Sequence, residues 1–238
     1  MANKPKQVER DRRAKVEEMR KAEQARERRK SMLFVLLAVV VGVALIAAVA
    51  IPSYLNSRND PVNKALSSFG VSAANASCDD VETNDAGDNV GKHVADGTVE
   101  EYETVPPSFG PHWGQPAFPA REFYTARDRP EMEQLVHNLE HGYTIVWYDD
   151  TIKGAELEDL QDIATRARTE DAVGPTGKFV VTAWDDAYGK FPSGKHIGIS
   201  HWSATEGHVQ LCGKVSGAVV QDFIDDFPAS DSPEPNAA

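Results

Sequence analysis

The longest pattern in the chain is an uninterrupted apolar run from Met32 to Ile51, with no charged side chain in 20 residues. At about 1.5 Å per residue, a helix of this length spans about 30 Å, which is the thickness of the hydrocarbon layer of a bilayer. Lipid offers no partners to backbone N–H and C=O groups, so the segment must be helical if it lies there. The pattern therefore predicts one transmembrane helix over residues 32–51.

Charge is distributed unevenly about this run. The first 30 residues carry 12 basic and 6 acidic side chains, which leaves a net charge of −18 for the rest of a chain whose total is −12. Because basic flanks stay on the cytoplasmic side, we expect a cytoplasmic N-terminus and an extracytoplasmic C-terminal part. A signal peptide cleaved near Ala48-Val49-Ala50 is the alternative. The lengths of the apolar and basic segments favour an uncleaved anchor in the cell membrane.

The segments beside the anchor lack a periodic apolar face. Residues 1–31 are rich in helix-forming Glu, Lys, Arg and Ala, and predict a basic helical tail. Its six acidic residues argue against nucleic-acid binding, whereas contact with the lipid bilayer is expected. Residues 52–77 are interpreted as a linker with a short helix from Asp60-Pro61 to Phe69 that ends at Gly70.

Apolar periodicity then predicts one compact α/β or α+β domain over residues 78–227. Its first part, 78–92, and the Pro-rich stretch 106–119 are expected to be irregular. Residues 228–238 are polar and Pro-rich, and predict a disordered tail. The patterns within the domain indicate strands over 98–105, 143–148, 179–184 and 196–202, and helices over 130–141, 156–168 and 215–227.

The two cysteines, Cys78 and Cys212, both follow the apolar run. Outside the cytoplasm two lone cysteines usually pair, so we predict a disulfide between them. Two unrelated buried thiols are the alternative. A thiol catalyst is disfavoured because the chain has no C-x-x-C motif.

All seven histidines also follow the apolar run, and the densest group is His137-Asn138-Leu139-Glu140-His141. Residues i and i+4 share a helix face, so His137 and His141 can bind one metal ion together. We expect His112, held by the rigid Gly-Pro before it, to be the third ligand, with His93 a weaker candidate and Glu140 beside the site. Imidazole donors without thiolates suit Zn²⁺ or Cu²⁺.

Two other interpretations of this group remain open. The H-x-x-E-H spacing matches a class of zinc peptidases in which Glu140 would be the general base, with Glu206 as a downstream ligand. A purely architectural role is the second, in which His141 caps the helix and Asn138 and Glu140 brace the Pro-rich loop. His196, His201 and His208 are interpreted as structural. Only one of His201 and Trp202 is expected to face the core, because neighbours on a strand alternate.

The sequence resembles the bacterial domain-of-unknown-function family DUF3105, which is common in actinobacteria. The resemblance rests on Cys78, His93, the PPSFGPH stretch at 106–112 and HNLEHGYTIVWY at 137–148, and it covers about residues 65–227. It implies a basic N-terminus, one anchor and an extracytoplasmic domain, and places His112, His137, Glu140 and His141 in the family signature. It implies no activity.

Two classes of function are compatible with these features. The first is a metal-binding protein of the cell envelope. The second is a non-catalytic accessory subunit whose acidic surface attracts another membrane or envelope protein. No nucleophile motif is present, which favours a protein without catalytic activity.

Overall fold

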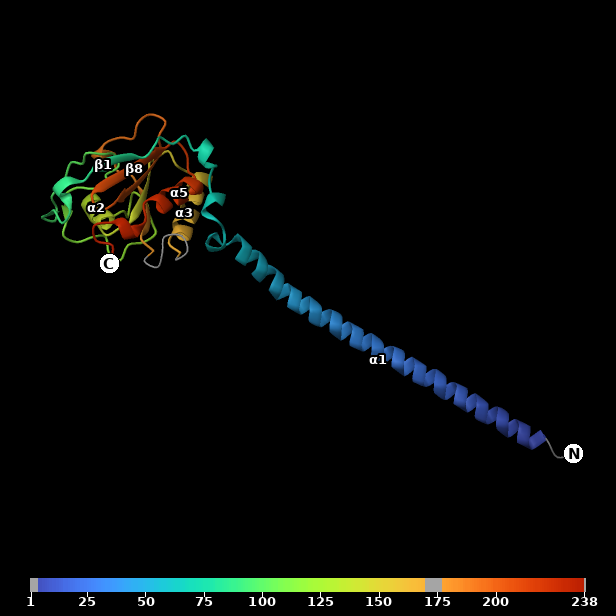
Figure 1. Cartoon of the computed structure of the whole chain (residues 1–238). Coiled ribbons are helices and arrows are strands. Elements are labelled where there is room, and N and C mark those ends of the chain that lie inside the picture. Colours follow the sequence, from blue (N-terminus) through green and yellow to red (C-terminus); the bar gives the residue numbers. More distant parts are fainter. Residues whose placement is uncertain (1–3, 170–176, 238) are drawn as a thin grey trace. The chain divides into compact units, whose positions relative to one another are not determined.

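The structure is a computed structural model that describes residues 4–169 and 177–237. The chain divides into two compact units, Met1–Arg58 and Asn59–Ala238, whose main helices and strands are labelled in Figure 1. The first unit is a helix, and the second is a sheet domain covered by helices on both faces.

Helix α1 (Lys4–Asn59) contains the predicted apolar segment as part of a continuous helix of 56 residues. Within the described residues it is the one helix long and apolar enough to cross a membrane, by length and composition. A signal sequence shares these properties. The helix continues through Pro52, where a linker was expected to begin. Residues 1–3 of the predicted basic tail lie outside the described residues.

A six-stranded mixed sheet forms the centre of the second unit, in the order β1-β8-β7-β5-β6-β4. Its strands β4, β5 and β6 are parallel, whereas β7, β8 and β1 continue the sheet in antiparallel fashion. This arrangement agrees with the mixed fold predicted from the sequence. The strands are β1 (Glu82–Asp85), β4 (Phe123–Tyr124), β5 (Thr144–Tyr148), β6 (Phe179–Ala183), β7 (Ile197–Trp202) and β8 (Glu206–Cys212).

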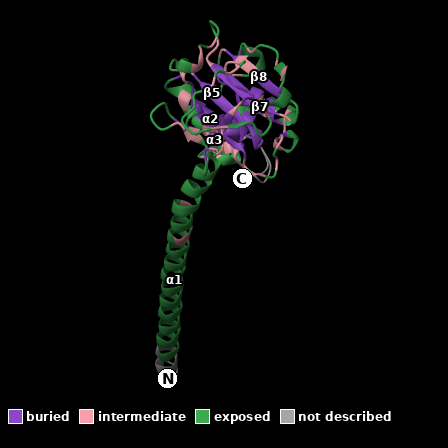
Figure 2. Ribbon diagram, turned by 90° about the vertical axis from the view of Figure 1, so that its left-hand side faces the viewer, coloured by how far each residue is buried: buried purple, intermediate pink, exposed green. Residues whose placement is uncertain are grey.

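Side chains that alternate along the central strands pack into two separate hydrophobic cores, one on each face of the sheet. Ile145 and Trp147 of β5 pack with helix α2 (Met132–Glu140), whereas Val146 and Tyr148 pack on the opposite face. The second face is covered by two further helices, α3 (Ala155–Ala167) and α5 (Gly217–Asp226). Figure 2 shows the buried strands at the centre of the domain.

Coverage of both faces corrects one expectation about β7. His201 and Trp202 are neighbours on this strand and both are fully buried. The alternation rule does place them on opposite faces, but neither face is exposed to solvent here.

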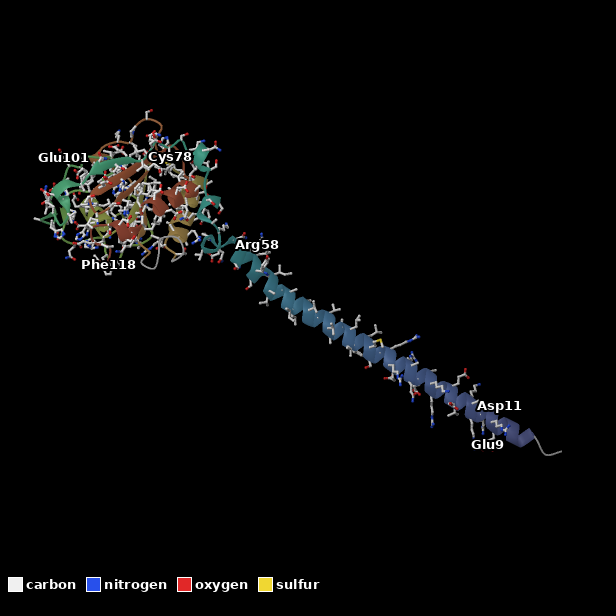
Figure 3. The ribbon with its side chains drawn as sticks, in the orientation of Figure 1. Glu9, Asp11, Arg58, Cys78, Glu101 and Phe118 are labelled. Carbon is white, nitrogen blue, oxygen red and sulfur yellow. A yellow bond between two sulfur atoms is a disulfide. The ribbon has the colours of Figure 1, made fainter. Side chains whose placement is uncertain are left out.

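The predicted disulfide is present, and it joins Cys78 to Cys212 at the end of β8. Cys78, labelled in Figure 3, lies ahead of β1, and both cysteines pack at the core that α3 and α5 cover. The bond therefore fixes the entry of the chain into the sheet.

Residues 59–77 belong to the compact domain and are not the linker that the sequence suggested. Leu66 and Phe69 are buried in the same core as α5. In place of one helix over 60–69 the chain forms two short 3₁₀ turns, η1 (Pro61–Asn63) and η2 (Leu66–Ser68), and a third, η3 (Ala73–Asn75), follows. The domain thus begins near Asn59 because these apolar side chains complete its core.

The strand predicted over 98–105 is absent from the structure. Side chains bind its backbone instead: Trp113 Nε1 donates to the carbonyl of Thr98, and the N–H of Glu100 donates to Glu133. The polar edge strand β1 and the short strand β4 were not predicted, and neither was β8. A two-residue strand, β3 (His112–Trp113), lies within the Pro-rich stretch and pairs with β2 (His93–Val94).

The C-terminal segment, residues 228–237, also differs from the expected disorder. It forms a short 3₁₀ turn, η6 (Ala229–Asp231), and Ser232 is buried. Two more such turns, η4 (Gly87–Asn89) and η5 (Asp186–Tyr188), lie in loops. Composition suggested disorder at the C-terminus because it cannot reveal the backbone hydrogen bonds that hold this segment. Ala238 lies outside the described residues.

Candidate metal centre

Helix α2 supplies two of the candidate ligands. Its start is fixed by a capping box between Glu131 and Gln134, and its apolar face packs into the core through residues such as Leu135 and Leu139. His137 and Glu140 lie three positions apart and therefore share a face of the helix. Both side chains are buried.

The small β2–β3 sheet supplies the other two. Its parallel register places His93 directly opposite His112, so their side chains lie next to each other. His112 follows Gly110, where a Cβ would lie 2.8 Å from the ring of Tyr102. Tyr102 also donates a hydrogen bond to the carbonyl of Pro111, which holds the loop that presents His112.

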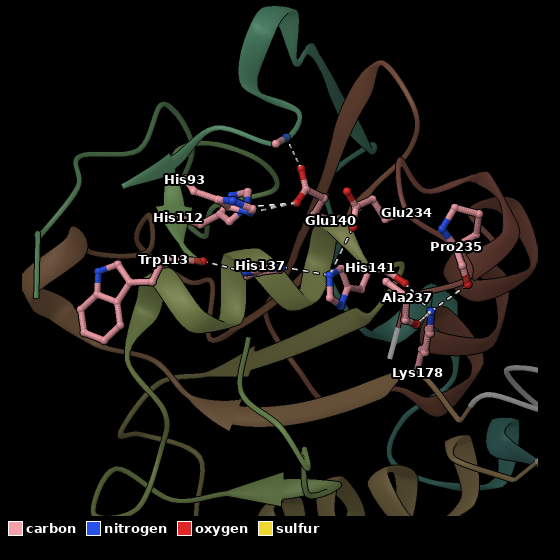
Figure 4. Close-up of polar contacts among 11 residues, drawn as sticks. His93, His112, Trp113, His137, Glu140, His141, Lys178, Glu234, Pro235 and Ala237 are labelled. Atoms are coloured by element: carbon pink, nitrogen blue, oxygen red, sulfur yellow. Dashed lines mark hydrogen bonds and ion pairs between the residues drawn. The ribbon is translucent and has the colours of Figure 1, made fainter. Parts of the chain in front are cut away.

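The four side chains lie close together, and Figure 4 shows His93 and His112 beside Glu140. One potential ligand atom from each of His93, His112, His137 and Glu140 lies within 4.8 Å of those of the other three. The three ring centroids form a nearly equilateral triangle with sides of 4.7, 5.0 and 5.0 Å. Donors about 2.0–2.1 Å from a tetrahedral zinc ion would be about 3.4 Å apart, so small side-chain rotations would complete such a site.

Backbone carbonyls orient the two buried imidazoles. His112 Nδ1 lies 2.8 Å from the carbonyl oxygen of Gly110, and His137 Nδ1 lies 2.6 Å from that of Trp113. Each Nδ1 must donate its hydrogen to its carbonyl, so Nε2 is the ring nitrogen left to bind a metal. His112 Nε2 faces Glu140, whereas His137 Nε2 lies 2.9 Å from His141 Nε2. Histidines that bind metals are commonly oriented by this second hydrogen bond.

The most informative contact is that between His112 Nε2 and Glu140 Oε2, which are 3.0 Å apart and fully buried. They are close enough for an ion pair but lack the alignment of a hydrogen bond, and neither atom has a hydrogen-bond partner among the described residues. His93 Nε2 lies 4.0 Å from the same carboxylate oxygen. Two lone pairs facing each other in a dry interior are unfavourable unless a cation or a proton lies between them. The other carboxylate oxygen of Glu140 accepts a hydrogen bond from the N–H of Gly91.

Burial and charge set the protonation of the cluster. Burial lowers the pKa of His137 to about 4, and the nearby rings of His112 and His141 act in the same direction. This keeps His137 neutral, as a metal ligand must be. Burial works to raise the pKa of Glu140, but His112 and the Gly91 N–H outweigh it, so its pKa falls below the usual value. The cluster thus combines the neutral imidazole of His137 with the carboxylate of Glu140.

The structure brings together most of the predicted ligands. His141, expected to be a ligand, lies outside the group, and His93, expected to be a weaker candidate, lies within it. His137 pairs with Glu140 on the helix, whereas His141 lies at the helix C-cap, outside the group of four. His141 Nε2 is 2.9 Å from His137 Nε2, so it stands next to the centre. His93, the weakest candidate by sequence, is within the group and is the ligand exposed to solvent.

Other histidines and the peptidase interpretation do not fit this geometry. Among the described residues, His196, His201 and His208 lie outside the group. Glu140 lies among the candidate ligands, where a peptidase would need it as a free base. Glu206, the downstream acid of that motif, is part of β8 and pairs with β1. Asn138 bonds the backbone of Ala117, which confirms its expected bracing role in the Pro-rich loop.

Several groups that contact the candidate ligands were not predicted from the sequence. The backbone groups of Gly91, Gly110 and Trp113 give no side-chain signal. Lys178, which bonds the carbonyl of His141, could have been noticed as a lone cation directly before the buried strand β6. Glu234, 3.5 Å from His141, is one acid in a polar tail and offers no such signal.

A family profile described as "Protein of unknown function (DUF3105)" matches residues 93–238, which is more than half of the chain. The chain belongs to the DUF3105 family. The match confirms the resemblance seen in the sequence, and its range starts at His93 and contains all four candidate ligands of this DUF3105 domain. No curated protein and no solved structure matches the chain significantly. The activity of this DUF3105 protein therefore has to be argued from its site.

Proposed function

We propose that this protein is a membrane-anchored domain that binds one Zn²⁺ or Cu²⁺ ion outside the cytoplasm through His93, His112, His137 and Glu140. The observation that carries the proposal is the buried contact between His112 Nε2 and Glu140 Oε2. A divalent cation satisfies both lone pairs at once, and a ring nitrogen of His137 lies within 4.8 Å of the ligand atoms of the other three residues.

The donor set supports these two ions. Three imidazole nitrogens and one carboxylate oxygen suit Zn²⁺ and Cu²⁺, and both cysteines are engaged in the disulfide and cannot supply a thiolate. The exposed ring of His93 gives the ion a path from solvent to three buried ligands.

Location outside the cytoplasm is supported by two features. The disulfide indicates an oxidising compartment. The apolar part of α1 has the length of a membrane span and follows a basic segment, which favours a cytoplasmic N-terminus. Catalysis is not part of the proposal, because four protein ligands can close a tetrahedral site.

The first prediction concerns metal content and affinity. Full-length protein purified in detergent without chelator should contain about one zinc or copper ion per chain by mass spectrometry. After chelation, adding that ion at about 100 times its Kd should stabilise the fold by about 2.7 kcal/mol, visible as a higher Tm. Glu140→Gln keeps the shape of the side chain but loses its charge, and should weaken binding more than tenfold.

His196→Ala is the matched control. The ring of His196 also pairs with a carboxylate, that of Asp149, but it lies outside the cluster. This variant should bind the ion as the wild type does. If the purified wild type contains no ion above background and added Zn²⁺ or Cu²⁺ leaves its Tm unchanged, His112 and Glu140 form an architectural ion pair and the proposal is wrong.

A further inference from the structure

The C-terminal segment, residues 228–237, is bound to the end of helix α2 that carries the candidate metal centre. The N–H of Glu234 donates to the carbonyl of Glu140 at 3.0 Å. Lys178 Nζ, which is buried, donates to the carbonyls of His141, Pro235 and Ala237 at 2.6, 2.9 and 2.9 Å. Its three hydrogens are thus all satisfied, and they join the segment to the residue that follows Glu140 (Figure 4).

Contacts between side chains also link this segment to the centre. His141 Nε2 lies 2.9 Å from His137 Nε2 and 3.5 Å from Glu234 Oε2. Because His137 donates its Nδ1 hydrogen to the carbonyl of Trp113, its Nε2 is an acceptor. The hydrogen between the two rings therefore belongs to His141.

A metal ion bound at the centre would compete for that same lone pair. Coordination of His137 through Nε2 removes the acceptor that His141 uses in the structure. The carboxylate of Glu234 is an acceptor within reach, and its side chain is 47% exposed, which leaves it room to move closer. A charged acceptor in this position makes a stronger hydrogen bond than a neutral one.

We infer that metal binding transfers the His141 hydrogen bond from His137 to Glu234, and that the C-terminal segment is a strap that tightens when the centre is loaded. The inference rests on the proposed function. Glu234 is then a positioning residue that acts through His141. Because coupling between two binding events is reciprocal, Glu234 must raise the metal affinity as much as the metal strengthens docking of the strap.

The expected size follows from other metal centres, where loss of an outer partner of a coordinating histidine costs roughly tenfold or more in affinity. Zn²⁺ affinity of the full-length protein in detergent, measured by competition with a chelating dye, should therefore fall about tenfold in Glu234→Ala. Glu234→Gln keeps an acceptor oxygen without the charge, so its affinity should lie between the two. Asp231→Ala removes an exposed carboxylate from the same segment and should leave the affinity unchanged.

A double-mutant cycle tests the route through His141. In a His141→Ala background no hydrogen bond has to be transferred, so Glu234→Ala should then change the affinity by less than about twofold. Hydrogen exchange supplies a second readout: amides of residues 229–237 should exchange more slowly in wild type with Zn²⁺ than without it. This difference should be lost in Glu234→Ala.

The possible failures are distinguishable. Wild-type protein that binds no Zn²⁺ overturns the proposed function and this inference with it. Wild-type protein that binds Zn²⁺ with an affinity indifferent to Glu234→Ala overturns the inference alone. The same holds if Glu234→Ala acts equally with and without His141, which would indicate a long-range charge effect, or if His141→Ala abolishes binding, which would make His141 a ligand.

Discussion

The buried histidines of this domain differ in the hydrogen-bond partners of their rings. In His112 and His137 a carbonyl binds Nδ1, so Nε2 is left to bind a metal. His201 is equally buried, but neither of its ring nitrogens has a hydrogen-bond partner among the described residues. A buried imidazole without partners strongly resists protonation, because the charged form would lose its hydration.

The pH dependence of stability should reveal this property of His201. Its pKa is lowered to about 4, first by burial and then by His208, its cross-strand neighbour; a poorly aligned contact with the backbone of Tyr143 and the charge of Asp231 oppose the shift only in part. In the unfolded chain this imidazole titrates near 6.5, so below that pH the unfolded state binds a proton that the folded state does not bind. Stability from this group is therefore present above pH 6.5 and is lost as the pH falls toward 4.

His201→Leu removes the titrating ring and isolates the effect. Between pH 7.5 and 4.5 the free energy of unfolding of the wild type should fall by roughly 2–3 kcal/mol more than that of the variant. Urea unfolding of both proteins, with chelator present to exclude metal effects, provides the measurement. Parallel pH profiles for the two proteins would show that the ring is protonated in the folded state.

At the scale of elements, the end of helix α2 is the junction on which the site depends. Gly142 follows the helix with φ +94°, at the junction between α2 and β5. A Cβ here would lie 2.6 Å from the carbonyl oxygen of Ala229 and 2.7 Å from Ser232 Oγ. The residue therefore provides both the left-handed turn and the space into which the C-terminal segment packs.

Comparison of two alanine variants should separate these contributions. Gly154 also has a positive φ, of +58°, but nothing lies within 4 Å of its missing Cβ. Gly154→Ala should cost about 1 kcal/mol in unfolding free energy from backbone strain alone, whereas Gly142→Ala should cost at least about 2 kcal/mol because the C-terminal segment must also shift. Equal losses in urea unfolding would mean that the segment contributes nothing at this position.

Elements with a strong periodic pattern were predictable, and those held by particular polar contacts were not. Strand β5 and helix α3 lie within about two residues of their predicted bounds, because apolar residues in the sequence mark their buried positions. The edge strand β1 is polar and mostly exposed, so no apolar pattern marks it. Residues 98–105 have the composition of a strand, yet Trp113 and Glu133 bind their backbone.

The same distinction applies to the site. Spacing identified His137 and His141 as a pair, but spacing alone could not show that the helix ends at Glu140 and that this carboxylate faces His112. His93, the weaker candidate by sequence, enters the group through the register of β2 and β3, a contact between segments about 20 residues apart. The candidate ligands were therefore predictable as a group, whereas their individual positions depended on tertiary structure.

For the whole molecule, the central question is the compartment that the domain occupies. The chain combines a net charge of −12, with a basic N-terminal segment ahead of the apolar run, and one disulfide in the sheet domain. A cytosolic domain would be exposed to reductants that keep thiols reduced. The state of Cys78 and Cys212 in cells is therefore a direct report on whether the domain has crossed the membrane.

The oxidation state of the two cysteines can be measured by thiol labelling. In protein taken from cells and denatured with a maleimide reagent present, neither cysteine of the wild type should be labelled until a reductant is added, whereas Cys78→Ser should expose one reactive thiol, Cys212. A variant that lacks residues 1–58 should remain in the cytosol with both thiols free. When purified under reducing conditions, it should be less stable than its oxidised form by about 2–5 kcal/mol, because reduction frees the unfolded chain from a long closed loop. Two labelled thiols in the wild-type chain would instead place the domain in the cytoplasm, and the anchor would then have the opposite orientation.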